Sequence, residues 1–538
     1  MASKIVATLT IFIVISLPLI KAQWQPNAFE ASLLDQACFN TENRAACLSR
    51  ISAAYRQGAG GPMPILNAAI GGALEEASKT IENVSNLQSA LENNVREEMA
   101  VRDCIELLNY TLDELRWSFE LIEKIDPAVA NLHREESFRS WLSAALSNQE
   151  TCLEGFDRTH GHLHVPVERE VRQLTQLVSN ILALHKRLRR IISHPPHESN
   201  TGIATFDLPP KPTWLTKDYE EQMHESGHAI HADAVVALDG TGQFRSITEA
   251  INSAPNNSTR RYVIYVKEGE YVEQVEVTRK KTNIVLIGDG MDKTVISGSR
   301  SHASGWTTFR SATFAVSGSG FIARDITFRN TAGPEGSQAV ALRVDSDCSV
   351  FYRCSIEGYQ DTLYAHSLRQ FYRDCNIYGT VDFIFGSGLI VVQHCNISGR
   401  TPLPKQVITI TAQSRNNKSV DHSGFSFQDC FIDSTYPTYL GRPWKPYSRV
   451  VFMQSYLGPK VEPAGWLEWP ENSGNDTVFY GEYMNHGPGA ELSGRVKWPG
   501  YHIIRDQKMA SLFTVRRFID GKSWLPSTGV TFMADLDG

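Results

Sequence analysis

The second half of the chain contains a near-repeat of about 20 residues, and this feature limits the fold more than any other. A cysteine followed two positions later by an isoleucine recurs in steps of 21 and 20 residues, in the pairs Cys354/Ile356, Cys375/Ile377 and Cys395/Ile397. A looser copy, FQDCFIDS, begins at Phe427. Repeats of this length that are rich in β-branched and aromatic residues are typical of a parallel β-solenoid, in which each repeat forms one coil. We therefore predict a stack of parallel coils in this region.

Two aspartates occupy equivalent places in successive repeats. Asp361 lies in GYQDTLY, and Asp382 lies 21 residues later in TVDFIFG. Because neighbouring strands are about 4.7–4.9 Å apart, one full coil is expected to place Asp382 directly over Asp361. Gln338 lies about one repeat before Gln360, so we expect it to join the same column. Two stacked carboxylates flanked by amides predict a functional site.

The residue types in this column fit acid–base or nucleophilic chemistry. Carboxylates a few ångströms apart tend to share a proton, which provides one base or nucleophile and one acid near neutral pH. Arg442, in LGRPW, carries a planar guanidinium that can hold a carboxylate in one orientation. The amides of Gln338 and Gln360 are neutral donors suited to an oxyanion. A single Asp or Gln on a coil more often forms a ladder or closes a turn, but four polar residues converging within apolar segments favour a site.

Aromatic residues near these positions predict a wall that packs against sugar rings. They are Tyr359, Tyr364, Phe383, Phe385 and Trp444. The long groove along a solenoid also suits an extended polymer.

The length and the apolar periodicity predict two domains. A chain of 538 residues is too long for one hydrophobic core. From about residue 62 to 193, four amphipathic stretches with short connections predict an up-and-down, all-α four-helix bundle. Five prolines between 195 and 212 mark a linker, and short strand-like segments bounded by turns follow from about 229. We place the helical domain at 28–195, the linker at 196–228 and the solenoid domain at 229–538.

The N-terminus predicts a secretory signal peptide over residues 1–22. Lys4 precedes a 16-residue apolar stretch, and Ala22 offers a cleavage site. The alternative is a retained signal anchor, since the stretch is near the shorter end of the spanning range. Sequons for N-glycosylation agree with secretion and occur at Asn83, Asn109, Asn256, Asn257, Asn396, Asn417 and Asn475. We expect some to be unused, because Asn256 and Asn257 overlap and Asn396 follows a stacked cysteine.

Nine cysteines in an oxidising compartment imply disulfides and at least one free thiol. Cys38 and Cys47 are close enough to close a local hairpin, and Cys104 and Cys152 are placed to join two helices. Among the five later cysteines, stacking allows either a Cys354–Cys375 or a Cys375–Cys395 bridge. Our candidate for the free thiol is Cys348.

The charge distribution gives no support for one class of partner, nucleic acid. Positions 231–538 carry 31 Lys+Arg and 30 Asp+Glu, a net charge of +1, so the total of −7 leaves −8 for positions 1–230. Basic stripes with interleaved aromatic residues are lacking, which argues against nucleic-acid binding. The histidine-rich segments HGHLH at 160–164 and HESGHAIH at 224–231 lack the carboxylate or cysteine partners of a closed zinc site, so we expect loop histidines and no metal.

The second domain contains a series of motifs in a fixed order: GEYVE at 269, QAVAL at 338, GYQDTL at 358, DFIFG at 382, LGRPW at 440, GWLEW at 465, YGEYMNHGPGA at 480 and WLPSTGV near the end. On these motifs the domain resembles the plant pectin methylesterases over about residues 225–538. The resemblance implies a right-handed parallel β-helix and a mechanism without metal or other cofactor. One departure is Ser387, where plant members often carry Asn.

The resemblance also implies roles for individual residues. Asp382 would be the nucleophile that attacks the C6 methyl ester of homogalacturonan, and Asp361 would donate a proton to methanol and then activate water. Gln360 and Gln338 would stabilise the negatively charged intermediate. The implied substrate contacts are Thr308, Gln338, Arg442 and Trp444. The implied setting is the extracellular cell wall, where pectinesterase activity converts pectin to pectate and methanol.

The helical region, about 28–195, resembles the inhibitor domain that precedes many pectin methylesterases. The residues that carry this resemblance are Cys38 and Cys47, Cys104 in RDCIELL and Cys152 in ETCLEGF. The Tyr-Pro pair usual between the first two cysteines is missing. The resemblance implies pectin methylesterase inhibitor proteins and a processing subtilase as partners. The basic run KRLRR at 186–190 is either a cleavage site or a solvated helix end.

Two other functions compete with an esterase. One is a catalytically silent pectin-binding or inhibitory protein, which would release no methanol. The other is a β-helix glycosidase that uses the same carboxylates, since carboxylate separations of about 5–9.5 Å serve that chemistry. A glycosidase shortens the polymer, whereas an esterase leaves its length unchanged.

Overall fold

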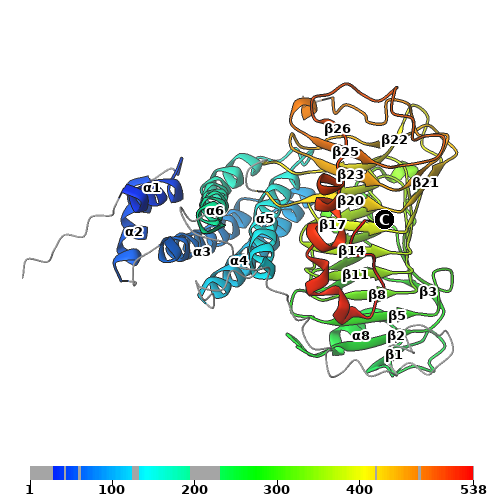
Figure 1. Ribbon diagram of the computed structural model, residues 1–538. Helices are drawn as coiled ribbons and strands as arrows, with labels where there is room; N and C mark the ends of the chain where they lie inside the picture. The colour runs from blue at the N-terminus through cyan, green and yellow to red at the C-terminus, as the bar shows by residue number, and fades with distance from the viewer. Residues whose placement is uncertain are drawn as a thin grey trace, which may run out of the picture.

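The computed structural model describes residues 28–41, 44–57, 62–91, 93–123, 132–193, 231–417, 421–470 and 474–536. A helical domain and a long stack of β-coils lie side by side within these ranges (Figure 1). The predicted signal peptide at 1–22 and linker at 196–228 lie outside the described residues. No described helix has the length and apolar character needed to cross a membrane.

The helical domain contains the four predicted long helices and two shorter ones that the periodicity did not reveal. The long helices are α3 (Pro62–Asn86), α4 (Val95–Glu123), α5 (Leu132–Glu154) and α6 (His164–Ser193). The short helices α1 (Ala28–Ala37) and α2 (Arg44–Gln57) precede them, and a 3₁₀ turn (Leu87–Ala90) follows α3. The four-helix prediction is therefore incomplete, because α1 and α2 are too short and too weakly amphipathic to stand out in the sequence.

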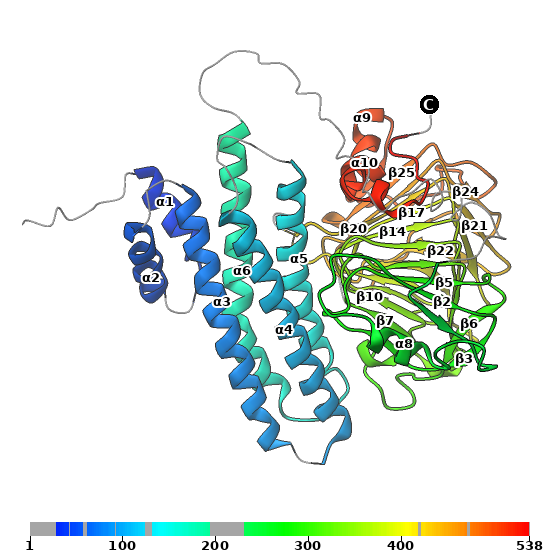
Figure 2. The same ribbon diagram turned by 90° about the horizontal axis from the view of Figure 1, so that it is seen from below.

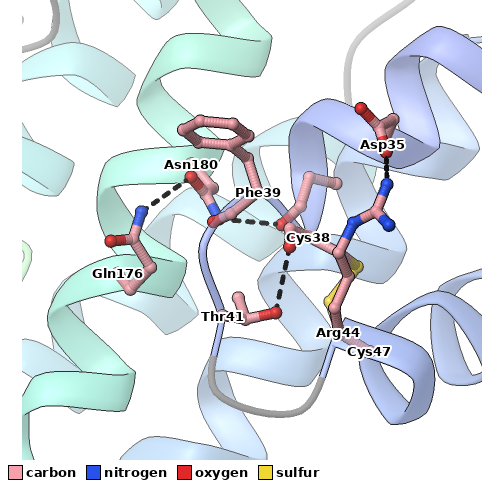
Figure 3. The surroundings of a disulfide bond; sticks show 9 residues. Asp35, Cys38, Phe39, Thr41, Arg44, Cys47, Gln176 and Asn180 are labelled. Atoms are coloured by element: carbon pink, nitrogen blue, oxygen red, sulfur yellow. Dashed lines mark hydrogen bonds and ion pairs between the residues drawn. A yellow bond between two sulfur atoms is a disulfide. The ribbon is translucent and has the colours of Figure 1, made fainter.

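Two disulfides hold the helical domain together, in the pairings expected from the spacing. Cys38–Cys47 joins the end of α1 to α2, and Cys104–Cys152 joins α4 to α5. Figure 3 shows how the first disulfide is fixed to the bundle. The Nδ2 atom of Asn180, on α6, donates to the carbonyl of Phe39 at 2.7 Å. The short helices are thereby tied to the long ones.

The second domain is a right-handed parallel β-helix built from three sheets, as predicted. The first sheet consists of β1 (Ala234–Val236), β2 (Tyr262–Val266), β5 (Ile284–Gly288), β8 (Ile322–Arg324), β11 (Ser349–Tyr352), β14 (Arg369–Arg373), β17 (Leu389–Gln393), β20 (Gly424–Gln428), β23 (Arg449–Met453), β25 (Phe479–Tyr483) and β26 (Tyr501–Ile503). The second sheet consists of β4 (Val275–Val277), β7 (Phe314–Val316), β10 (Leu342–Val344), β13 (Leu363–Ala365), β16 (Ile384–Gly386), β19 (Ile408–Gln413) and β22 (Thr438–Gly441). The third sheet consists of β3 (Gly269–Val272), β6 (Thr294–Gly298), β9 (Thr327–Asn330), β12 (Ser355–Glu357), β15 (Asn376–Gly379), β18 (Asn396–Gly399), β21 (Phe431–Ser434) and β24 (Tyr456–Leu457).

Short helices complete the β-helix at its start and along one side. Helix α8 (Ile247–Ser253) packs near β1, β2 and β4 at the beginning of the stack. Helices α9 (Gln507–Ala510) and α10 (Val515–Phe518) lie against the first sheet, where Phe513 and Phe518 join Phe371 and Val391 in one apolar cluster. Both views show this red C-terminal segment beside β17 and β14 (Figures 1 and 2). The outer face of the first sheet is therefore covered by the end of the chain.

The repeat sets the register of the coils. The isoleucines of the Cys-x-Ile element pair across the third sheet, Ile356 with Ile377 and Ile377 with Ile397. Their cysteines, with Cys430, are buried in the β-helix core. Neither of the two possible bridges among them forms, and Cys348 is also a free thiol. The stacked thiols instead donate to backbone carbonyls, as Cys375 does to Phe351 at 3.3 Å.

Candidate active site

The two aspartates of the column stand just before neighbouring strands of the second sheet. Leu363 in β13 pairs with Ile384 in β16. Asp361 lies two positions before Leu363, and Asp382 lies two positions before Ile384, so Asp382 lies on the coil directly above Asp361. The backbone N–H of Asp361 donates to the carbonyl of Val381 at 3.1 Å, which fixes this register. Both aspartates have left-handed backbone angles, with φ of 61° and 51°, a region that Asp tolerates better than most residues. The tight corner turns both side chains to the same side of the helix.

Asp382 is held by a cation and a hydroxyl. The guanidinium of Arg442 donates from Nε to Oδ1 at 2.8 Å and from Nη2 to Oδ2 at 2.6 Å. Thr409 donates its hydroxyl to Oδ1 at 2.7 Å. A two-pronged charge-assisted pair of this kind fixes the carboxylate plane and stabilises its ionised form. The carboxylate of Asp382 is therefore held in one orientation, and only 6% of the residue is exposed.

Asp361 is in the opposite electrostatic situation. Its pKa is raised well above the usual value, first by burial and then by the neighbouring charge of Asp382, although Arg442 opposes the shift. Burial and the neighbouring charge therefore favour the protonated form of Asp361, while Arg442 and Thr409 hold the carboxylate of Asp382. The pair can supply one acid and one nucleophilic oxygen in the same place.

The other predicted site residues line the same cavity as the two aspartates. This cavity measures about 720 Å³, and its walls include Thr308, Gln338, Gln360, Asp361, Asp382, Arg442 and Trp444. Gln338 is not in the strict column, because β10 and β13 pair Leu342 with Leu363, which makes Tyr359 rather than Gln360 level with Gln338. Gln338 reaches the cavity from the neighbouring position on the lower coil.

The predicted aromatic wall needs correction. Tyr364, Phe385 and Trp444 line the cavity, but Phe383 is completely buried in the β-helix core. Asp382 has a left-handed backbone at the corner before β16, and both residues that follow it, Phe383 and Ile384, pack in the core. Tyr359 lies outside the cavity lining, with its ring centroid 5.0 Å from the guanidinium carbon of Arg400.

Two tryptophans that were not predicted as site residues also line the cavity. The ring of Trp469 lies 4.3 Å from the guanidinium carbon of Arg442, and Trp306 belongs to the same lining. Their signals were present in the motif GWLEW and in the segment GWTTF. Cation–π contact with Trp469 gives Arg442 a second support besides its pair with Asp382.

Comparison with known proteins identifies the chain. The Pectinesterase family matches residues 233–522, and the Plant invertase/pectin methylesterase inhibitor family matches residues 32–184. The chain belongs to the pectinesterase family. It is a carboxylic ester hydrolase with an N-terminal inhibitor-like domain.

Its relatives include full-length proteins and a solved structure. A pectinesterase/pectinesterase inhibitor of Arabidopsis thaliana is 49% identical over 521 residues, which cover 94% of this chain and 93% of the relative. Pectinesterase/pectinesterase inhibitor PPE8B of Prunus persica is 47% identical over 479 residues, 86% of this chain and 89% of that protein. The pectin methylesterase from carrot matches with a TM-score of 0.57 and 48% identity, over 57% of this chain and 99% of that structure.

The inhibitor-like domain of this pectinesterase closes one side of the cavity. Its contribution to the lining consists of Arg96 on α4 and of Thr151, Glu154, Gly155, Asp157 and Arg158 from the end of α5 and the turn after it. Glu154 pairs with Lys445 at 2.7 Å, next to Trp444. Figure 2 shows α4 and α5 between the rest of the bundle and the β-helix.

A second group of contacts anchors α4 to the β-helix beside the cavity. Asp103 accepts from Nε of Arg310 and from the hydroxyl of Thr307, both at 2.5 Å, and Glu106 pairs with the same arginine. Glu114 pairs with Arg279 at 2.6 Å. Burial raises the pKa of Asp103 to about 6 and that of Glu114 to about 7, although the arginines oppose both shifts.

The described residues contain no group of three His, Cys, Asp or Glu side chains placed to hold a metal ion. His160 and His162 of the HGHLH segment are exposed loop residues. The HESGHAIH segment, except His231, lies outside the described residues.

Proposed function

We propose that this pectinesterase hydrolyses the C6 methyl esters of homogalacturonan with Asp382 as the nucleophile and Asp361 as the proton donor. The observation that carries the proposal is the unequal state of the two carboxylates. Arg442 and Thr409 hold the carboxylate of Asp382 in one orientation, and burial together with the charge of Asp382 raises the pKa of Asp361. An ester hydrolysis that passes through an acyl-enzyme needs such a pair.

The first half of the reaction transfers the acyl group to the enzyme. A carboxylate oxygen of Asp382 attacks the ester carbonyl carbon, and the carbonyl oxygen becomes an oxyanion. The side-chain amides of Gln360 and Gln338 donate to that oxyanion. When the intermediate collapses, the bond to the methoxy oxygen breaks, Asp361 gives its proton to that oxygen, and methanol leaves. An anhydride between Asp382 and the galacturonyl group remains.

The second half returns the enzyme to its starting state. The carboxylate of Asp361 accepts a proton from water, and the resulting hydroxide oxygen bonds to the anhydride carbonyl carbon. Collapse expels the carboxylate of Asp382 and releases the free acid of the sugar, while Asp361 keeps the proton. Thr308, Trp444 and Gln338 line the cavity where the sugar ring would lie.

Product analysis separates this proposal from its rivals. On methylated polygalacturonate the enzyme should release one methanol for each new carboxyl group without shortening the polymer. Asp361→Asn should reduce kcat by at least about 100-fold, because proton donation typically contributes about 10²–10⁴-fold. Polymer shortening would assign the carboxylates to a glycosidase, and pectin binding without methanol would indicate a silent protein.

We propose that the inhibitor-like domain restricts access to the cavity and that the protein acts in the extracellular cell wall. The end of α5 and Glu154 occupy one side of the cavity. The basic run at 186–190 stands near the end of α6, which ends at Ser193, and is our candidate site for a processing subtilase. Free inhibitor proteins would compete for the surface that the domain now covers.

N-terminal sequencing of the secreted protein tests this processing. A mature start near Ile191 supports cleavage at the basic run. An intact N-terminus after residue 22 in active, secreted protein would contradict it.

A further inference from the structure

The third sheet lies on the side of the β-helix away from the helical domain (Figures 1 and 2). A column of side chains runs along this sheet. Its members pair in register and are Asn376, Asn396, Phe431, Tyr456 and His486. We call these five residues the outer column. It shares no residue with the cavity lining described above.

In the outer column, the ring of Phe431 stacks on another aromatic ring on one of its two faces only. The rings of Phe431 and Tyr456 are parallel within 4°, with centroids 4.6 Å apart, and His486 meets Tyr456 edge-on. The other face of Phe431 is turned toward the next strand, where Asn396 is its register partner. Phe431 is 45% exposed, an unusual position for a phenylalanine in a parallel sheet. The open ring face therefore adjoins an asparagine side chain about one strand spacing away.

Asn396 is also the first residue of a sequon, Asn396-Ile397-Ser398. The buried Cys395 before it points into the core, and the alternation of the strand turns Asn396 outward, where it is exposed. Its Nδ2 atom donates to Oδ1 of Asn376 at 2.9 Å. A glycosylated amide nitrogen keeps one N–H, so this hydrogen bond is compatible with a glycan. The stacked cysteine that made this sequon doubtful instead ensures that the asparagine faces solvent.

We infer that Asn396 carries an N-linked glycan whose first sugar ring packs on the open face of Phe431. In the transfer, Nδ2 of Asn396 bonds to the anomeric carbon of an oligosaccharide carried on a lipid diphosphate. The bond from that carbon to the diphosphate oxygen breaks, the lipid diphosphate leaves with the electron pair, and the amide loses one proton to the transferase. The sugar then leaves the sheet parallel to the neighbouring ring, at a separation set by the strand spacing.

The arrangement explains why Phe431 is exposed at this place. The apolar face of an N-acetylglucosamine ring covers Phe431 as a further aromatic ring would, and the stack of Phe431 and Tyr456 is extended by one sugar. The glycan would stand on the side of the β-helix away from α4 and α5, where it obstructs neither the cavity nor the docked domain. The inference requires entry into the secretory pathway but does not depend on the esterase mechanism.

The test uses the full chain secreted from plant cells with its own N-terminus. Mass spectrometry of the peptide that contains Asn396 should find it glycosylated. Asn396→Gln and Ser398→Ala should each remove the glycan and lower Tm by about 2 °C, as expected for loss of one ring-stacking contact in a domain of this size. Ser398→Ala leaves the hydrogen bond between Asn396 and Asn376 in place. It therefore separates the effect of losing the sugar from the effect of losing the asparagine side chain.

Phe431 decides whether the sugar stacks. In a Phe431→Leu background, which keeps an apolar side chain without a ring face, Ser398→Ala should leave Tm unchanged. Asn109→Gln removes an exposed sequon on α4 and is the matched control, so its effect on Tm should be the same with and without the Phe431→Leu change.

Two results would overturn the inference. One is an unmodified Asn396 in the secreted protein, and the other is an equal loss of Tm for Ser398→Ala with and without the Phe431→Leu change. Methanol release should be unchanged in all these variants, which keeps this test separate from that of the esterase.

Discussion

At the scale of single residues, the site depends on two carboxylates that differ in their partners. Arg442 and Thr409 hold Asp382 by hydrogen bonds, whereas burial and the neighbouring charge of Asp382 raise the pKa of Asp361. The repeat spacing was enough to predict that Asp361 and Asp382 meet, because one coil of a solenoid returns the chain to the same side. Arg442 lies two coils beyond Asp382, and both of these coils are longer than the repeat. It could be predicted as a site residue only from its guanidinium and its motif. Thr409 carried no signal, because its role depends on the register of β19 beside Asp382.

Arg442→Lys tests whether orientation matters beyond charge. Lysine keeps the positive charge but loses the two-pronged geometry, so Asp382 should turn away from the ester carbonyl. We expect kcat to fall by about 10- to 100-fold with little change in KM, since small misplacements near reacting atoms cost about 100-fold. Steady-state methanol release measures both constants. Unchanged kcat would show that the fork geometry is dispensable.

At the scale of elements, the register of the coils determines which residues meet. The sequence predicted the coils from the Cys-x-Ile repeat, and the pairing of Ile356, Ile377 and Ile397 follows it. The prediction that Phe383 belongs to the aromatic wall was wrong, because its ring packs in the core after the left-handed corner at Asp382. Helices α1 and α2 were missed, since they depend on packing against α3 and α6 and on the Cys38–Cys47 disulfide more than on their own periodicity.

The distribution of disulfides predicts that reduction acts on one domain only. Both disulfides lie in the helical domain, and the five described cysteines of the β-helix are free thiols. A disulfide that closes a loop of tens of residues typically stabilises by about 3–4 kcal/mol. Mild reductant should therefore lower the unfolding temperature of the helical domain and leave that of the β-helix unchanged. Calorimetry measures both transitions, and an equal shift of the two would contradict the assignment.

At the scale of the whole molecule, docking of the helical domain is the feature that local sequence patterns did not predict. Helices α4 and α5 bury charged residues against the β-helix, among them Asp103 against Arg310 and Glu114 against Arg279. The partners are 207 and 165 residues apart in the chain, and neither pair stands in a repeat or motif that would join them. Only the assembled surfaces bring them together.

The buried carboxylates predict that docking weakens as pH rises. The docked pKa values of Asp103 and Glu114 are raised from 3.8 and 4.5 to about 6 and about 7, so the docked form binds more protons than the separated one. The contribution of these two carboxyl groups to docking is then largest below about pH 4 and is progressively lost up to about pH 7. Glu106 opposes this in part, because Arg310 and Arg343 outweigh its burial and lower its pKa.

Separation of the domains measures this dependence. A protease site placed within 196–228 allows the chain to be cut, and calorimetry then gives the affinity between the two parts from about pH 5 to about pH 7.5. We expect at least about a tenfold loss of affinity between pH 5 and pH 6, since each proton taken up contributes about a factor of ten per pH unit. The double variant Asp103→Asn with Glu114→Gln should reduce the slope of the curve between about pH 5 and about pH 6. A wild-type affinity that rises with pH would contradict the direction of the shifts.

The most direct test of the whole account is methanol release by Asp382→Asn, with Asp429→Asn as its control. Asp429 also follows a strand of the β-helix with a left-handed backbone (φ 53°), but it stands outside the cavity lining. Asparagine preserves the shape of Asp382 and cannot attack the ester, so we expect kcat to fall at least about 10⁴-fold while the control retains its activity. Methanol production by Asp382→Asn at a rate within about tenfold of the unmodified enzyme would contradict the assignment of the nucleophile.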